Sequence, residues 1–92
     1  MTELEKIKAE LNAISDKWEN YVKTNIKKTE DNIYYWNNMK LLLQSIDDHS
    51  IEITKYKNKY ISYFDDKERQ YIETIIRDCL VRFDKFSRAV KL

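Results

Sequence analysis

The sequence predicts an all-α protein, and two observations support this prediction. Gly and Pro are both absent from the 92 residues, although average usage predicts about six and about five of them. Tight turns with positive φ favour Gly, and helix interiors disfavour both residues. Apolar residues recur at helical spacing along most of the chain. We expect one domain, residues 1–92, forming an elongated antiparallel helical hairpin or a four-helix bundle, with helices at about 2–46, 50–64 and 66–91.

The first predicted helix begins with a capping box made by Thr2 and Glu5. The apolar stripe that follows keeps its phase as far as Ile46, which corresponds to a helix roughly 65 Å long. A break between Thr29 and Asn32 is the alternative, because the stripe thins there and the residues resemble a new helix start.

The clearest predicted turn is the stretch 47–50, Asp-Asp-His-Ser, because these side chains readily bond their own backbone. Residues 51–64 then follow helical spacing, and a β-hairpin is the alternative because β-branched and aromatic residues are frequent there. Asp65 and Glu68 resemble the cap of the last helix, which has the cleanest amphipathic pattern of the chain.

The most apolar segment of the chain reads NIYYWNNMKLLLQSI, and its helical projection has two apolar sides. The wide side, which we expect to face the core, holds Tyr35, Trp36, Met39, Leu42, Leu43 and Ile46, with Ile33 beyond one edge. A narrower ridge on the other side holds Tyr34 and Leu41, flanked by Asn37 and Asn38. A helix that is apolar on two sides needs two coverings. We therefore expect these four residues, together with Tyr63, to bind a partner protein or a second copy.

The charges are nearly balanced, with 17 basic and 16 acidic residues and a formal net charge of +1. This balance argues against a DNA mimic and against a strongly basic nucleic-acid binder. A nucleic-acid-associated accessory factor is still an alternative, because lysines lie near tyrosines that could stack on bases. Its candidate phosphate contacts are Lys23, Lys27, Lys28, Lys55 and Lys59.

No catalytic, cofactor-binding or metal-binding residues are predicted. Phosphate-binding loops, nucleophile elbows and EF-hand loops all require Gly, which is absent. His49 is the only histidine, whereas a metal site needs three or four converging ligands. Cys79 lies on the apolar face of the last predicted helix, where a buried cysteine behaves as a small hydrophobe. The single cysteine and the absence of a hydrophobic leader predict a soluble cytoplasmic protein that does not bind membranes.

The leading functional hypothesis is a small non-enzymatic α-helical protein–protein interaction module. Aromatic residues make up 13% of the chain, and Tyr and Trp are frequent interface anchors. The many Lys, Ile, Asn and Tyr residues have AT-rich codons. This composition favours a phage or mobile-element inhibitor or regulator of a host complex, such as defence or transcription machinery. A self-assembling structural homo-oligomer is the third alternative.

Overall fold

The computed structural model describes residues 2–26 and 32–90, with side chains from residue 35 onward in the second range. Three long helices and one short 3-10 turn make up this part of the chain: α1 (Glu3–Asn25), α2 (Asn32–Tyr60), η1 (Ile61–Tyr63) and α3 (Asp66–Ala89). The described residues contain no strand, which confirms the all-α prediction.

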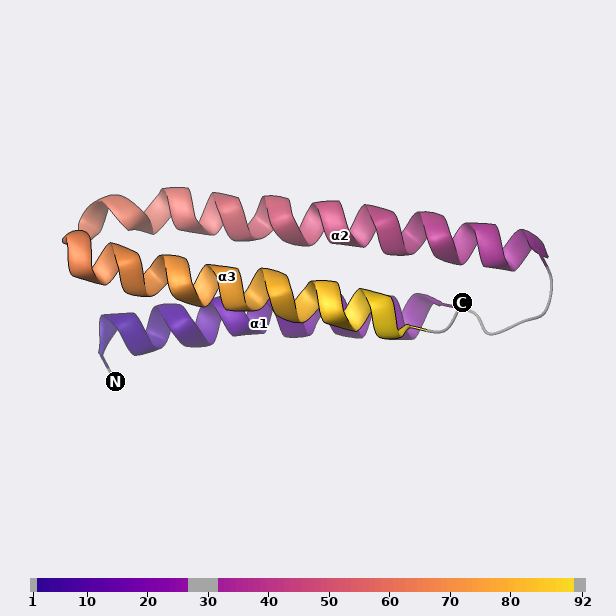
Figure 1. The fold of residues 1–92 in the computed structure, drawn as a ribbon, viewed down its shortest axis with the longest axis horizontal. Helices are drawn as coiled ribbons and strands as arrows, with labels where there is room; N and C mark the ends of the chain where they lie inside the picture. Colours follow the sequence, from indigo (N-terminus) through magenta and orange to yellow (C-terminus); the bar gives the residue numbers. More distant parts are fainter. Residues whose placement is uncertain (1, 27–31, 91–92) are drawn as a thin grey trace.

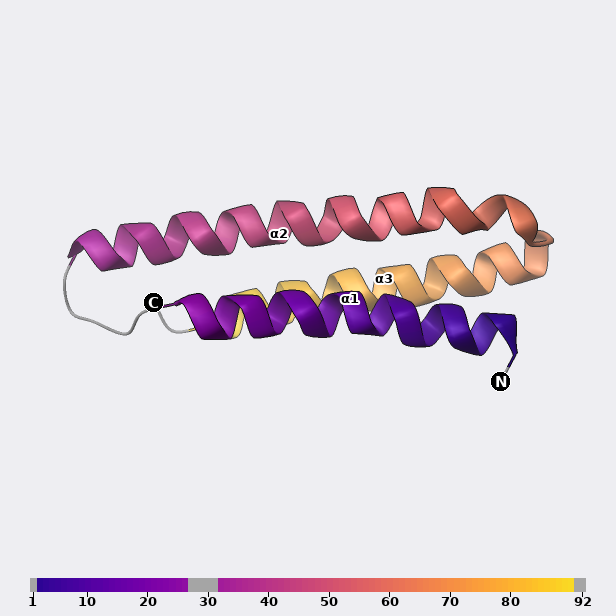
Figure 2. The same ribbon diagram turned by 180° about the vertical axis from the view of Figure 1, so that it is seen from behind.

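The three helices lie side by side in an elongated bundle measuring 52 × 21 × 16 Å. Helices α1 and α3 run in the same direction, and α2 runs alongside them in the opposite direction (Figure 1). The view from behind shows the same arrangement (Figure 2). The described residues therefore form a three-helix bundle rather than the hairpin or four-helix bundle that the sequence predicted.

The prediction of one helix reaching Ile46 is wrong. Helix α1 ends at Asn25, Ile26 is extended with φ −73° and ψ 126°, and α2 runs in the opposite direction from Asn32. The Asn25 side chain donates to the carbonyl oxygen of Tyr21 at 2.8 Å, a local bond of the kind that competes with helix continuation. The alternative of a break before Asn32 agrees with the structure, although residues 27–31 lie outside the described part.

The predicted turn at 47–50 is also wrong, because these residues lie in the middle of α2. The side chains of Asp48 and His49 find partners within the helix or on α1 instead of bending the backbone. The side-chain amide of Gln44 donates to Asp48 at 3.1 Å, and His49 is hydrogen-bonded to Ser15 of α1. Helix α2 then continues to Tyr60, so the alternative of a β-hairpin over 51–64 is excluded.

The predicted starts of the first and last helices are confirmed. Thr2 Oγ1 accepts from the Glu5 backbone N–H at 3.2 Å, and the Glu5 carboxylate accepts from the Thr2 backbone N–H at 3.4 Å. Asp65 and Glu68 form the same reciprocal pair, with distances of 2.9 and 3.1 Å. Such caps each contribute about 1 kcal/mol to the free energy of unfolding. They mark the two helix starts that the sequence predicted correctly.

The core consists of two apolar clusters with a polar layer between them. The first cluster lies around the start of α1 and contains Ile7, Leu11, Ile53, Ile72, Ile75 and Cys79. The second lies around the start of α2 and contains Val22, Leu42 and Phe83. Between them, Ser15 from α1 and Ser45 and His49 from α2 are almost completely buried. Polar side chains therefore occupy the centre of the bundle.

Candidate functional site

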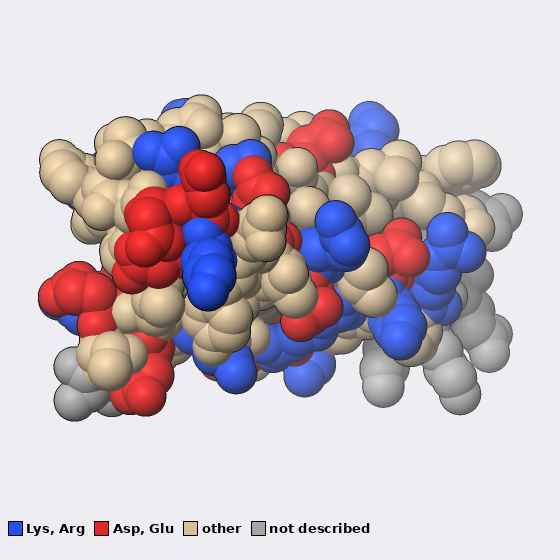
Figure 3. Space-filling view, turned by 60° about the vertical axis from the view of Figure 1, so that its left-hand side comes forward, with Lys and Arg blue, Asp and Glu red and all other residues tan. Residues whose placement is uncertain are grey.

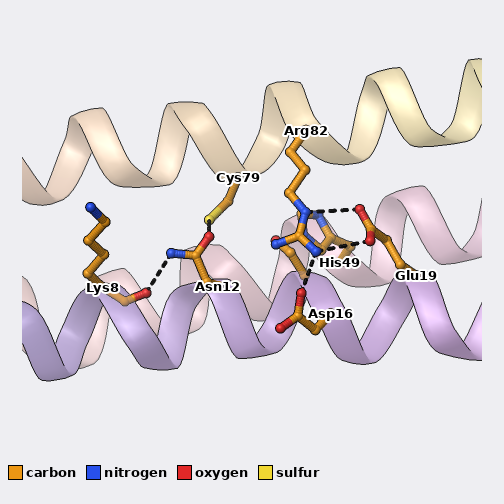
Figure 4. Close-up of polar contacts among 8 residues, drawn as sticks. Lys8, Asn12, Asp16, Glu19, His49, Cys79 and Arg82 are labelled. Atoms are coloured by element: carbon orange, nitrogen blue, oxygen red, sulfur yellow. Dashed lines mark hydrogen bonds and ion pairs between the residues drawn. The ribbon is translucent and has the colours of Figure 1, made fainter.

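The buried polar layer brings together side chains from all three helices (Figure 4). Ser15 Oγ and His49 Nε2 are hydrogen-bonded at 2.8 Å, and the His49 ring stacks on Phe83 with centroids 4.3 Å apart and an angle of 10°. The Cys79 thiol donates to Asn12 Oδ1 at 3.7 Å. These contacts fix how α1, α2 and α3 align, because a shift along any helix would leave buried polar atoms unpaired.

An arginine on α3 closes one side of this layer with two acidic residues of α1. Arg82 Nε and Nη2 each donate to Glu19 at 3.0 Å, and Nη2 also contacts Asp16. The hydrogen bonds that Arg82 donates to the carboxylates of Glu19 and Asp16 raise the pKa of Arg82, so the guanidinium stays charged. This forked pairing links α1 to α3.

Burial controls the ionisation of His49 and Cys79. Desolvation lowers the pKa of His49; Glu52 and Glu19 oppose this effect, and Arg82 adds to it. Desolvation also raises the pKa of the Cys79 thiol, although the hydrogen bond from Ser15 and the charge of Arg82 act in the opposite direction. The neutral forms of both side chains are therefore favoured in the folded protein.

The contacts in this layer join the three helices. Cys79 is 1% exposed, and a nucleophilic cysteine requires an accessible site that favours the thiolate. Within residues 2–26 and 32–90, no group of three or more His, Cys, Asp or Glu residues is placed to hold a metal ion. None of the helices in the same part of the chain is long and apolar enough to span a membrane.

Helix α2 has apolar side chains on two sides, and the structure confirms only part of the predicted core side: Leu42 is buried and Ile46 packs against the same cluster, whereas other expected core residues are exposed. The residues that face the core include several that are polar: Asn38, Leu42, Ser45, His49 and Ile53 are each 6% exposed or less. The expected core residues Trp36 and Leu43 lie on the opposite side and are 63% and 56% exposed. The residues do form a helix with the expected period. The distribution of apolar residues around that helix, however, does not show which side is buried.

The exposed side of α2 carries a continuous row of side chains that we call the outer strip. Its members are Trp36, Lys40, Leu43, Asp47 and Ile51, all of them exposed. At 100° per residue they span an arc of about 80°, roughly opposite the buried side of the helix. Tyr35 borders the strip, with its ring 5.5 Å from the Trp36 ring in an edge-to-face arrangement. The strip is thus a mixed apolar and charged surface.

The structure separates the residues that were predicted to bind a partner. Leu41 is half-buried against the cluster around Phe83, and Asn38 is 5% exposed, so both face the bundle interior. Asn37 is exposed, and Tyr63, 79% exposed, lies beyond the far end of α2 in η1. The side chain of Tyr34 lies outside the described part. These residues do not form one surface.

The candidate phosphate-binding lysines are also dispersed. Lys55 and Lys59 lie at the end of α2 that meets the start of α1, where Tyr56 contacts Glu10, whereas Lys23 lies at the other end of α1. Lys27 and Lys28 lie outside the described residues. Figure 3 shows acidic and basic side chains interleaved on the face that it presents. The described lysines therefore do not join into one basic surface, and nucleic-acid binding stays an untested alternative.

Comparisons with protein-family models, with curated proteins and with solved structures find no match for this chain. The geometry of the bundle is therefore the basis for proposing a function. The outer strip was not predicted from the sequence, because Trp36 and Leu43 were expected to face the core. The hydrogen bond between Ser15 and His49 helps to determine which side of α2 is buried. It joins residues 34 positions apart, so it could not be predicted from local sequence patterns.

Proposed function

We propose that this protein is a non-enzymatic helical interaction module that binds a protein through the outer strip of α2. The observation that carries the proposal is the exposure of Trp36 and Leu43, two turns apart on the same side of one helix. An isolated exposed apolar residue is ordinary on a protein surface. A Trp and a Leu aligned on the face opposite the core have the geometry of helix-mediated recognition.

The energetics support an interface of this kind. Burying a whole Leu or Phe side chain contributes about 1.5–3 kcal/mol, so completing the burial of Leu43 or Trp36 would contribute roughly 1–2 kcal/mol each. The fold does not need these side chains, because α2 already packs against α1 and α3 through its other side. Tryptophan is also among the residues most enriched at energetic hot spots of interfaces.

Within this class, the proposed role is that of an inhibitor or regulator of a larger complex, the phage or mobile-element role predicted from composition. This role is proposed in addition to the binding surface. Identifying the bound protein would test it separately.

The substitution Leu43→Glu tests the surface. With the chain immobilised and exposed to an extract of the cells that produce it, we expect Leu43→Glu to lower the amount of retained protein at least tenfold, as expected for a hot-spot residue. Val81→Glu is the matched control, since Val81 is 46% exposed on α3 and lies outside the strip. Equal retention by Leu43→Glu and the unmodified chain, with both folded by circular dichroism, would contradict the proposal.

A further inference from the structure

We propose that the partner of the outer strip is a second copy of this chain, with the two α2 helices antiparallel and related by a two-fold axis between Leu43 and Gln44. This inference rests on the proposed function, since it names the protein that the strip binds. It follows from the order of charged and apolar residues along the strip and from the symmetry of closed dimers.

The strip has the alternation that a self-complementary contact requires. Along α2 it reads apolar, basic, apolar, acidic, apolar, in the order Trp36, Lys40, Leu43, Asp47 and Ile51. A two-fold interface uses the same surface on both copies, so each residue must be compatible with the residue that the symmetry places opposite it. Opposite charges at equal distances from the axis meet this condition.

Charge decides between the available alignments. The two-fold axis could pass through one of three places near the middle of the strip that lie opposite the core. These are Lys40, the peptide between Leu43 and Gln44, and Asp47. An axis at Lys40 sets two lysines against each other, and an axis at Asp47 does the same with two aspartates. A parallel pair of α2 helices would produce both repulsions at once. Opposed like charges disfavour all three of these arrangements.

A two-fold axis between Leu43 and Gln44 places opposite charges, not like charges, next to each other. It places Lys40 at the level of the partner's Asp47, and it does so twice by symmetry. Trp36 lies at the level of the partner's Ile51, and Leu43 packs beside the partner's Leu43. Each exposed apolar residue of the strip therefore gains an apolar neighbour.

Lys40 and Asp47 are available for this pairing. Seven residues separate them, roughly 10 Å along the helix axis, which is too far for an ion pair within α2. The ion pairs found among the described residues join other side chains, such as Lys17 with Glu52 and Lys57 with Glu73. A second chain is the partner that satisfies both charges together.

The size of the contact predicts a reversible dimer. From Trp36 to Asn58 the exposed side of α2 is roughly 33 Å long and about 10 Å wide, so each copy would bury on the order of 350 Å². This is about half of the 800 Å² per partner that is usual for stable complexes. We therefore expect dissociation in the micromolar to high-micromolar range.

Sedimentation equilibrium of charge-reversal variants tests the proposal. The unmodified chain should change from 11.3 kDa towards twice that mass as its concentration rises from 1 to about 500 µM, a range chosen to span such weak association. Lys40→Glu or Asp47→Lys should each weaken the dimer roughly tenfold, since each disrupts two ion pairs and adds repulsion. The double variant Lys40→Glu/Asp47→Lys should restore it. Lys85→Glu, an exposed charge reversal on α3, should have no effect.

Cysteine cross-linking tests the alignment independently. Leu43→Cys should form a disulfide-linked dimer on oxidation, because the two copies of residue 43 lie beside the axis. Ser50→Cys should not, because its two copies would lie about 20 Å apart along the helices. The native Cys79 is 1% exposed and should not react. Cross-linking of Ser50→Cys but not of Leu43→Cys would overturn the alignment.

The outcomes distinguish this inference from the proposed function. A chain that stays monomeric at every concentration, while Leu43→Glu still loses a retained protein, would overturn the second copy as partner and leave the proposed function in place. A dimer that the double charge reversal does not restore would overturn the antiparallel alignment. Unchanged mass and unchanged retention in Leu43→Glu would contradict the proposed function itself.

Discussion

Replacing Phe83 with Ala should lower the free energy of unfolding by about 3–5 kcal/mol, the usual cost of removing a buried aromatic ring. Phe83 is 2% exposed, stacks on His49 and contacts the Phe86 ring at 5.6 Å between centroids. It belongs to the apolar cluster with Val22 and Leu42 and also forms one wall of the polar layer. Its loss would therefore open a cavity and expose the Ser15–His49 pair to rearrangement.

This decrease in the free energy of unfolding is large for a chain of 92 residues, whose total free energy of unfolding is expected to be roughly 5–14 kcal/mol. Urea unfolding followed by circular dichroism would measure it. Val81→Ala, on the exposed side of α3, is the control and should change the free energy of unfolding by no more than about 0.5 kcal/mol. A loss below 1 kcal/mol in Phe83→Ala would show that Phe83 does not pack as described.

Acidification should destabilise the protein through His49. Burial lowers the pKa of His49 in the folded state, whereas an unfolded histidine has a pKa of about 6.5. Between these two pKa values the unfolded chain binds more protons than the folded chain. The free energy of unfolding is therefore highest above pH 6.5 and falls as the pH falls through the folded pKa, with a slope that approaches about 1.4 kcal/mol per pH unit.

The charged groups around His49 act in both directions without changing this sign. Glu52 and Glu19 favour the protonated ring, and Arg82 disfavours it, but desolvation is the largest contribution. Carboxylates titrate mainly near pH 4, so the interval from pH 7.5 to 5.5 isolates the only histidine of the chain.

Urea unfolding of the unmodified chain and of His49→Gln across this interval would measure the effect. Gln keeps a polar group within reach of Ser15 but does not titrate, so the variant should have a nearly constant free energy of unfolding. A slope that persists in His49→Gln, or a constant free energy in the unmodified chain, would contradict the account.

The local features of the fold could be predicted from the sequence. The capping pairs Thr2/Glu5 and Asp65/Glu68 act between residues three positions apart, so the sequence contains all the information that they require. The helical state of most residues follows in the same way from the absence of Gly and Pro. Helix α3 was predicted best, because its buried side is almost entirely apolar.

The orientation of α2 could not be predicted in this way. The more apolar side was expected to face the core, but the bundle buries the polar Ser45 and His49 beside Leu42. Ser45 satisfies its hydroxyl by donating to the Leu41 carbonyl oxygen at 2.7 Å, and His49 depends on Ser15 of another helix. Burying these polar groups is acceptable only with such partners, and one of them is distant in sequence.

The same partners explain why the stretch 47–50 does not form a turn. Asp48 and His49 have side chains that favour turns when no other bond is available. In α2 they bond to Gln44 and to Ser15. The candidate surface was missed for the same reason, since exchanging the two sides of α2 moves Trp36 and Leu43 from the core to the outside.

In this proposal, one side of α2 packs against α1 and α3, and the opposite side is left exposed and partly apolar for association. Two adjacent leucines test it most directly, because Leu42 is 6% exposed and Leu43 is 56% exposed. Urea unfolding at micromolar concentration should give a loss of more than 3 kcal/mol for Leu42→Glu, which buries a charge, and a change within about 1 kcal/mol for Leu43→Glu. If Leu43→Glu is destabilised as much as Leu42→Glu, then Leu43 belongs to the core and the outer strip does not exist.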